Sequence, residues 1–276
     1  MKRLHENSLS CKLCDSDNLK ILFTGSFDPK KITNFSQYAI YDDIFKCEDC
    51  GFITQKQSHD IEQIIEYLNN EEYEDKTIGQ LNLIEKSRSY SPLVNTIQRY
   101  HPLSGSALLD VGANTGVFAN LARDLGAFPD GLEPSIEATK VAKSRFDLNI
   151  QNGVISEIDF PSDSFDIITM WDVVEHLYDP ITDLKILQPK LRRGGYIFVS
   201  THNIDHVFCK ILGKHNPLLM YQHFHHFNPS TLKKALSKAG FEPVGIRYFY
   251  KSWSLRYLLA LFDEFWPKSI LSSCAR

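Results

Sequence analysis

The chain has 276 residues and a formal net charge of −4, with 30 Lys and Arg against 34 Asp and Glu. The length is enough for one large domain and a small one, and the 43% hydrophobic content supports a sizeable core. The chain has no basic segment that would grip nucleic-acid phosphates, no apolar run near the roughly 18 residues that span a bilayer, and no apolar signal stretch at its start, so we expect a cytoplasmic protein with nucleic acid disfavoured as a partner.

The first 56 residues carry two cysteine pairs, Cys11-x-x-Cys14 and Cys47-x-x-Cys50. Each pair predicts a tight knuckle, and two knuckles complete a tetrahedral zinc site. Two disulfides are disfavoured in the cytoplasm, and a redox motif needs only one such pair. We therefore predict a zinc ribbon over residues 1–56 with short strands at 19–24 and 38–45. Four cysteines leave no open position, which makes the Zn²⁺ structural.

Residues 57–100 are predicted to link the ribbon to the large domain. Apolar residues at helical spacing predict an amphipathic helix over 60–69. An acidic connector over 71–75 and a helix from about 81 to 100 follow.

From residue 101 to 276 the pattern alternates between strands and helices, which indicates a mostly parallel sheet covered on both faces and therefore an α/β fold. The expected strands are 107–111, 128–133, 148–153, 165–171, 195–201 and 241–250, and the expected helices are 115–126, 135–144, 181–192 and 230–239.

The most informative stretch is the glycine-rich turn at the end of the first of these strands. It runs from Leu108 to Gly116, and Glu133 follows at the end of the next strand. Such a strand-turn-helix-strand unit approaches a ligand closely and offers a carboxylate to a ribose diol. Asp110, just before the first glycine, would repel a pyrophosphate but not a cationic sulfonium. The spacing Gly112-x-x-x-Gly116 also differs from the dinucleotide pattern, so S-adenosylmethionine (SAM) is favoured.

The acid-then-glycine pattern resembles the first motif of class I SAM-dependent methyltransferases. The resemblance continues at 131–135, at 165–177 and at 191–200, which look like the second motif, the fourth strand with its turn, and the fifth strand of that family. It implies a Rossmann-like, seven-stranded methyltransferase sheet behind a small N-terminal zinc-ribbon domain. The whole chain resembles bacterial two-part proteins of this kind.

The resemblance also implies roles in the cofactor site. The glycine turn would hold the methionyl part, Glu133 the ribose, the backbone after the third strand the adenine, and the turn after the fourth strand the sulfonium or substrate. Many relatives place an acid in the adenine segment, and residues 152–156 have none at the expected position. The predicted cofactor residues are Asp110, Gly112, Ala113, Asn114, Gly116, Glu133, Pro134, Val154, Ile155, Trp171 and Asp172.

Several histidines cluster in the second half of the chain, and residues 221–229 resemble a segment at the substrate pocket of small-molecule methyltransferases. Transfer to a hydroxyl suits a base with a pKa near neutral. Our ordered candidates for this base are His225, His176 and His226. Two alternatives stay open: histidines that make buried structural hydrogen bonds, and a histidine metal site. We expect Glu175 to orient a neighbour or cap a short helix.

The resemblance implies a carbohydrate acceptor, because such proteins are frequently linked to surface-glycan and sugar O-methylation. The aromatic residues of 247–276 predict a lid, a dimer surface, a membrane-surface contact or simple packing against the domain. The alternatives for function are a ribosomal RNA base methyltransferase, a phenol or quinone O-methyltransferase, and a non-catalytic SAM-binding module.

Overall fold

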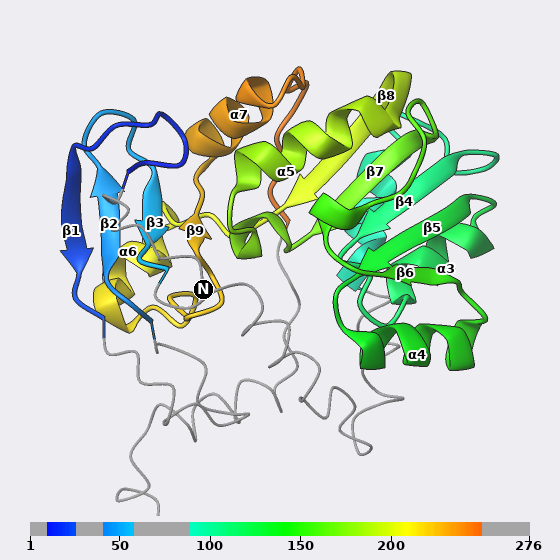
Figure 1. Cartoon of the computed structure of the whole chain (residues 1–276), viewed down its shortest axis with the longest axis horizontal. Coiled ribbons are helices and arrows are strands. Elements are labelled where there is room, and N and C mark those ends of the chain that lie inside the picture. Colours follow the sequence, from blue (N-terminus) through cyan, green and yellow to red (C-terminus); the bar gives the residue numbers. More distant parts are fainter. Residues whose placement is uncertain (1–9, 26–40, 58–88, 250–276) are drawn as a thin grey trace, which may run out of the picture.

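The computed structural model describes residues 10–25, 41–57 and 89–249. Two sheets lie side by side, a small antiparallel one and a larger parallel one, with α5 (Pro180–Leu187) and α7 (Pro229–Lys238) along the side that joins them (Figure 1). The described residues include no helix long and apolar enough to cross a membrane.

The larger sheet has five parallel strands in the order β6-β5-β4-β7-β8. This order puts the first strand of the domain, β4, in the centre, and its residues are almost entirely buried. The strands are β4 (Ala107–Val111), β5 (Phe128–Glu133), β6 (Ile150–Asn152), β7 (Phe165–Trp171) and β8 (Leu191–Ser200).

The helices pack against this sheet because this buries their apolar faces. Helix α3 (Val117–Asp124) buries Phe118 and Ala122 in a core with Leu108 and Ile167. Helix α4 (Ile136–Phe146) begins at Ser135, whose hydroxyl accepts the Ala138 N–H as an N-cap. The core of the α5 side joins buried residues of β4, β5 and β7, including Leu109, Leu132 and Ile168, to the apolar face of α5.

The small sheet, which we call the ribbon sheet, has the order β1-β2-β3-β9. Its first three strands are β1 (Leu19–Phe23), β2 (Ile44–Cys47) and β3 (Ile53–Gln55). The fourth, β9 (His225–His226), comes from the large domain and pairs Thr54 with His225. After β8 the chain forms helix α6 (Val207–Leu212) and a loop, and then β9, which lies before α7. The fourth strand of the ribbon sheet is therefore supplied by the large domain.

The cysteine knuckles also pack against the large domain. Cys11, Cys47 and Phe52 share one buried cluster with Val174, Ile181, Phe227 and Ala235. The Lys238 ammonium, at the end of α7, donates to the Leu13 carbonyl and to Asp15. The ribbon and the large domain thus share one buried cluster.

The observed boundaries match the predicted ones for β4, β5 and β7 and differ elsewhere. The predicted helix 181–192 ends at Leu187, because Pro189 cannot continue it, and β8 begins at Leu191. Residues 241–249 form no strand; they carry Pro243, which lacks an N–H, and they lie across a cavity from β8. Five of the six expected strands of this domain are therefore present in the described residues, against the seven that the resemblance implies. The predicted helix 60–69, connector 71–75, and most of the aromatic tail lie outside the described residues.

Candidate active site

The predicted cofactor residues gather at one edge of the parallel sheet. They follow the carboxyl ends of four neighbouring strands: the glycine turn follows β4, Glu133 and Pro134 end β5, Val154 and Ile155 follow β6, and Trp171 and Asp172 end β7. Open α/β sheets bind ligands at this edge. The fold therefore brings together residues that are up to 62 positions apart in the sequence, from Asp110 to Asp172.

The glycine turn needs glycine at both ends. Gly112 and Gly116 have φ of 71° and 77°, and a Cβ on Gly112 would lie 2.4 Å from Val173 Cγ2. The Gly112 and Ala113 N–H groups donate to the Leu132 carbonyl, which fixes the turn on β5. Asn114 also has a positive φ, of 50°. The backbone of the turn therefore lies at the carboxyl edge of the sheet, where a ligand could approach it closely.

Two buried acids lie beneath this turn. Glu133 accepts the Asn114 and Ser135 N–H groups at 2.9 Å each, and burial raises its pKa. Asp110 accepts the Thr169 hydroxyl at 2.7 Å. Burial, with a smaller contribution from Glu133, raises the pKa of Asp110 to about 7. In the part of the chain that the structure describes, neither acid has a Lys or Arg ion-pair partner, so the site favours a cationic ligand.

The buried Asp110 should make the ligand-free protein less stable as the pH rises. The folded pKa of about 7 exceeds the ordinary 3.8, so the folded state binds the extra proton, and its stabilising effect is lost between about pH 4 and pH 7. Each pKa unit corresponds to roughly 1.4 kcal/mol, so the loss should reach a few kcal/mol. Urea unfolding at pH 5 and pH 8 should show this loss in the wild type and not in Asp110→Asn.

Asp159→Asn, at an exposed position, is the matched control and should follow the wild type. Parallel pH dependence in the wild type and Asp110→Asn would contradict this assignment.

The turn after β7 is tied to the end of β8. Asp172 has a φ of 56°, its N–H donates to the Ser200 carbonyl, and the Ser200 hydroxyl donates to its carboxylate at 3.2 Å. Trp171 packs edge-on against Phe118, and its buried Nε1 has no hydrogen-bond partner among the described residues. The sequence interpretation missed Thr169, Val173 and Ser200. Thr169 and Ser200 bond to the two aspartates, and the only signal for them was their position at strand ends.

The adenine segment has one feature that the sequence interpretation missed. Ile155 is buried, and the Asn152 side-chain amide donates to the carbonyls of Glu133 and Pro134. The exposed Glu157 places a carboxylate oxygen 3.5 Å from the Val154 nitrogen. An acid is therefore present beside this backbone, at the residue that directly follows the 152–156 stretch.

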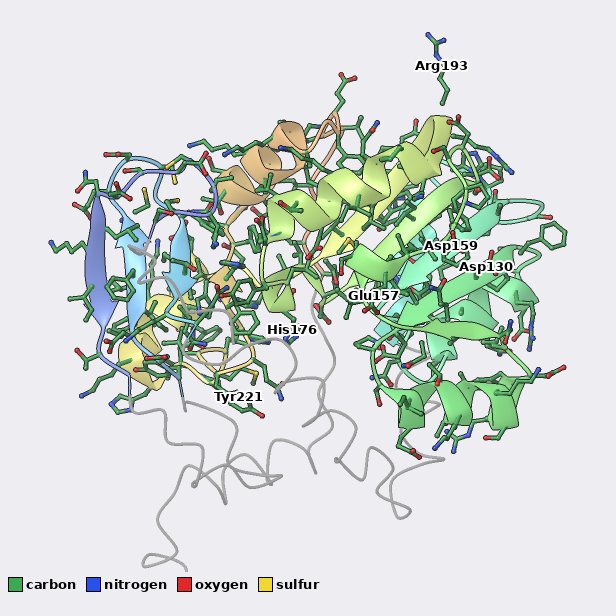
Figure 2. The ribbon with its side chains drawn as sticks, in the orientation of Figure 1. Asp130, Glu157, Asp159, His176, Arg193 and Tyr221 are labelled. Atoms are coloured by element: carbon green, nitrogen blue, oxygen red, sulfur yellow. The ribbon has the colours of Figure 1, made fainter. Side chains whose placement is uncertain are left out.

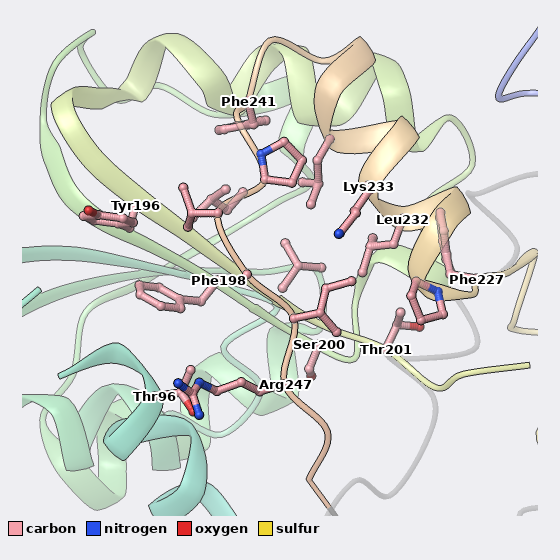
Figure 3. A pocket seen from close by; sticks show the side chains of 18 of the residues that line it. Thr96, Tyr196, Phe198, Ser200, Thr201, Phe227, Leu232, Lys233, Phe241 and Arg247 are labelled. Carbon is pink, nitrogen blue, oxygen red and sulfur yellow. The ribbon is translucent and has the colours of Figure 1, made fainter. Parts of the chain in front are cut away.

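A cavity of about 410 Å³ lies along β8, the last strand of the sheet in the described residues, and reaches the site at Trp171 and Ser200 (Figure 3). Its wall is aromatic at Tyr196 and Phe198, and it carries cations at Lys233 of α7 and Arg247. Buried Thr201 Oγ1, like Trp171 Nε1, has no hydrogen-bond partner among the described residues. This volume is within the range of small-molecule sites.

The histidines divide into two groups. His225 is fully buried between its bonds to Thr54 Oγ1 (3.1 Å) and the Tyr178 carbonyl (3.4 Å), and it stacks on Phe52. Burial lowers the pKa of His225 to about 4. These contacts make His225 a link between the ribbon sheet and the large domain, and they disfavour our first candidate base because no substrate can reach it.

The second group, which we call the histidine cluster, comprises Glu175, His176, His202, His223 and His226. The rings of His176 and His223 are 4.7 Å apart, and His202 Nε2 lies 3.0 Å from His226 Nδ1. His226 is fully buried, and burial lowers its pKa well below the usual range. His176, in contrast, is only partly buried. Figure 2 places His176 between the two sheets, and His176 ends the short helical turn Val174–His176 that follows Asp172 in the chain.

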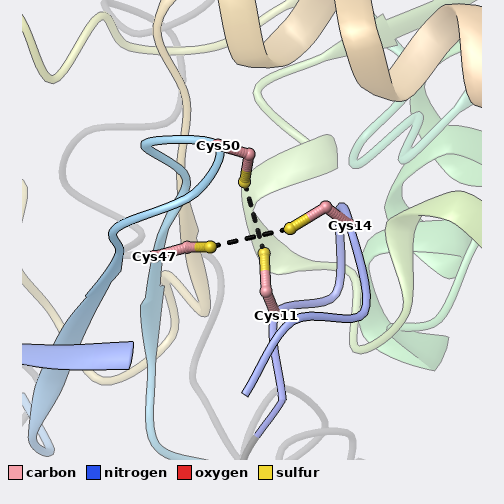
Figure 4. A group of neighbouring side chains, drawn as sticks. All are labelled: Cys11, Cys14, Cys47 and Cys50. Carbon is pink, nitrogen blue, oxygen red and sulfur yellow. Dashed lines mark hydrogen bonds between the residues drawn. The ribbon is translucent and has the colours of Figure 1, made fainter. Parts of the chain in front are cut away.

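The four ribbon cysteines converge on one point, as a metal centre would require. The Sγ atoms of Cys11 and Cys50 are 3.5 Å apart and those of Cys14 and Cys47 are 3.6 Å apart (Figure 4). Four thiolates at about 2.3 Å from one zinc ion would be about 3.8 Å from each other, so the arrangement fits the metal. Burial raises the pKa of Cys47, but the Cys50 and Asp49 N–H groups and neighbouring thiols outweigh it and bring the pKa to about 7.

Comparison with known families agrees with this geometry. A sequence profile described as a methyltransferase domain matches residues 85–245, more than half of the chain. The chain belongs to the methyltransferase domain family. The predicted methyltransferase family is therefore confirmed, and SAM is supported as its cofactor. The match includes the glycine turn, the two buried acids and the Asp172 turn.

Two curated relatives are named ubiquinone biosynthesis O-methyltransferase. The one from Thiobacillus denitrificans is 30% identical over 108 residues, 37% of this chain and 47% of the relative. The one from Ralstonia nicotianae is 28% identical over 180 residues, 59% of this chain and 74% of the relative. The chain thus spans about half the length of the first relative.

A solved SAM-dependent methyltransferase from Leishmania major has a TM-score of 0.52 and 19% identity, and the match covers 67% of this chain and 74% of that one. This likeness confirms an α/β Rossmann-like fold with a parallel central sheet.

Proposed function

We propose that this protein transfers a methyl group from SAM to a hydroxyl oxygen of a small acceptor, a sugar, nucleotide sugar or glycan. The observation that carries the proposal is the edge of the parallel sheet, where the glycine turn lies over Asp110 and Glu133 beside a cavity. The two acids suit a ligand with a sulfonium and an ammonium group. Glu133 keeps lone pairs beyond its two backbone bonds, which suit ribose hydroxyls.

Methyl transfer is a displacement at carbon in which the acceptor oxygen, the methyl carbon and the sulfonium lie in line. Positioning therefore supplies much of the rate enhancement. The acceptor oxygen bonds to the methyl carbon, the carbon–sulfur bond breaks, and the hydroxyl proton must leave. Of the three predicted histidines, His176 is the best placed to act on the acceptor, because it is partly exposed and follows the Asp172 turn. It would act as a base or through a bound ion.

The residues that line the cavity favour an acceptor that has both a flat ring and an anionic group. Tyr196 and Phe198 offer flat surfaces for a sugar, and Trp171 Nε1 and Thr201 Oγ1 are buried groups that acceptor hydroxyls would satisfy. Lys233 and Arg247 suit a phosphate such as that of a nucleotide sugar. A phenolic acceptor is the second candidate, and the names of the two relatives favour it.

We also propose that the four cysteines hold one structural Zn²⁺, as their spacing supports. The ion would crosslink the two knuckles, whose own apolar core is small, and supply folding energy outright. Its thiolates leave no position for a substrate.

The deciding experiment is transfer of a labelled methyl group from SAM to a panel of nucleotide sugars, glycans, phenols and RNA. We expect label in a hydroxyl-bearing small molecule. His176→Ala should lower the rate constant kcat about 100-fold with little change in SAM affinity, whereas His215→Ala, at an exposed position, should leave it unchanged. Label in RNA alone, or in nothing while SAM binds, would overturn the proposal.

A further inference from the structure

The histidine cluster contains three groups aimed at one point. One ligand atom each of Glu175, His176 and His223 lies within 4.8 Å of the others. Glu175 is 2% exposed, and its Oε2 is buried without a hydrogen-bond partner among the described residues. An unsatisfied buried carboxylate oxygen costs free energy, so a partner is expected there.

The hydrogen bonds of the two histidines fix which nitrogen faces this point. His176 Nδ1 lies 2.9 Å from the Gln222 carbonyl and His223 Nδ1 lies 2.8 Å from the Leu218 carbonyl. A carbonyl only accepts, so Nδ1 carries the proton in each ring and Nε2 keeps its lone pair. Three acceptors, two imidazole nitrogens and one carboxylate oxygen, therefore converge.

Neighbouring polar groups contact these three side chains, as is usual for residues that bind a metal. Backbone carbonyls orient both imidazoles, which fixes tautomer and ring direction. His202 Nδ1 lies 3.7 Å from the other oxygen of Glu175, and His202 Nε2 is joined in turn to His226. Within the described part of the chain, no Lys or Arg ion pair neutralises Glu175.

We propose that Glu175, His176 and His223 form a second metal site, which binds a divalent transition-metal ion. Two imidazoles and one carboxylate suit zinc, iron or cobalt rather than magnesium. Three protein ligands leave a position open, in contrast to the four-cysteine centre. The site adjoins the Asp172 turn and His202, which lines the cavity. The ion would bind the acceptor hydroxyl and ease loss of its proton; only this role rests on the proposed function.

The test counts metal ions on the full chain after dialysis against Co²⁺ and, separately, Zn²⁺. The wild type should bind about two ions, one per centre. Glu175→Gln and His223→Gln should each bind about one, and the remaining Co²⁺ should show the thiolate charge-transfer bands that a histidine–carboxylate site lacks. The exposed-site control His215→Gln should keep both ions.

One ion in the wild type, or two in both ligand variants, would overturn the inference. SAM calorimetry on each variant shows whether it is folded, and Glu175→Gln, which preserves side-chain size, guards against a loss caused by misfolding. The outcome is independent of methyl transfer: two bound ions without any methylated acceptor would refute the proposed function and leave the metal site standing.

Discussion

Gly112→Ala should weaken SAM binding by about 100-fold, because it displaces the turn that we propose holds the methionyl group. An alanine at a φ of 71° already costs about 1–2 kcal/mol, and its Cβ would stand 2.4 Å from Val173 Cγ2. Either Val173 or the turn must move. Titration calorimetry with SAM measures the loss.

The neighbour that causes the clash supplies the control. Val173→Ala removes the clashing methyl group, so the double variant should recover part of the affinity, and the coupling between the two changes measures the contact. Gly105→Ala has the same backbone strain, with a φ of 81°, but no atom within 4 Å of its Cβ. It should lower stability by about 1 kcal/mol without changing SAM affinity. Equal affinity losses at Gly112 and Gly105 would show that strain, not the turn, is responsible.

The edge of the parallel sheet that carries the predicted cofactor residues was predictable from the sequence, because each strand and turn that forms it is recognised from a short local pattern. A buried strand that ends in glycine must turn, and parallel strands bring their carboxyl ends to one edge. Hence the sequence alone predicts that Asp110, Gly112, Glu133 and Asp172 lie at this edge. Their side-chain partners were not predictable: the bond from Thr169 to Asp110 depends on the register between β4 and β7, which nothing in the local pattern specifies.

The histidines were harder to interpret because neighbours in sequence face opposite ways. Side chains alternate along a strand, so in β9 His225 points to Phe52 and the ribbon while His226 meets His202. The sequence predicted no strand at residues 225–226, since pairing with β3 depends on a partner about 170 residues away. Without that pairing, His225 looked like a candidate base; with it, the residue is a buried link between the two sheets.

Removal of the Zn²⁺ that we propose for the four-cysteine centre should unfold the ribbon sheet and leave the parallel sheet intact. Structural zinc sites contribute on the order of 10 kcal/mol to folding, far more than the few buried residues of the ribbon itself can replace. Hydrogen exchange should therefore accelerate in β2 and β3 after chelation, whereas amides of β4 and β7, bonded within the other sheet, should stay protected. Cys14→Ser should act like the chelator, and Cys209→Ser, outside the centre, should act like the wild type.

Because β9 belongs to the ribbon sheet, the same treatment should reach the histidine cluster. His226 lies in β9 beside His225, which is held by Thr54, and its bond to His202 depends on that register. We expect exchange to accelerate at residues 223–227 as well, and the imidazole resonances of His202 and His226 to shift. Unchanged resonances after loss of the ribbon would mean that β9 is held by the large domain alone, through Phe227 and α7, and that the zinc centre stabilises only its own end of the molecule.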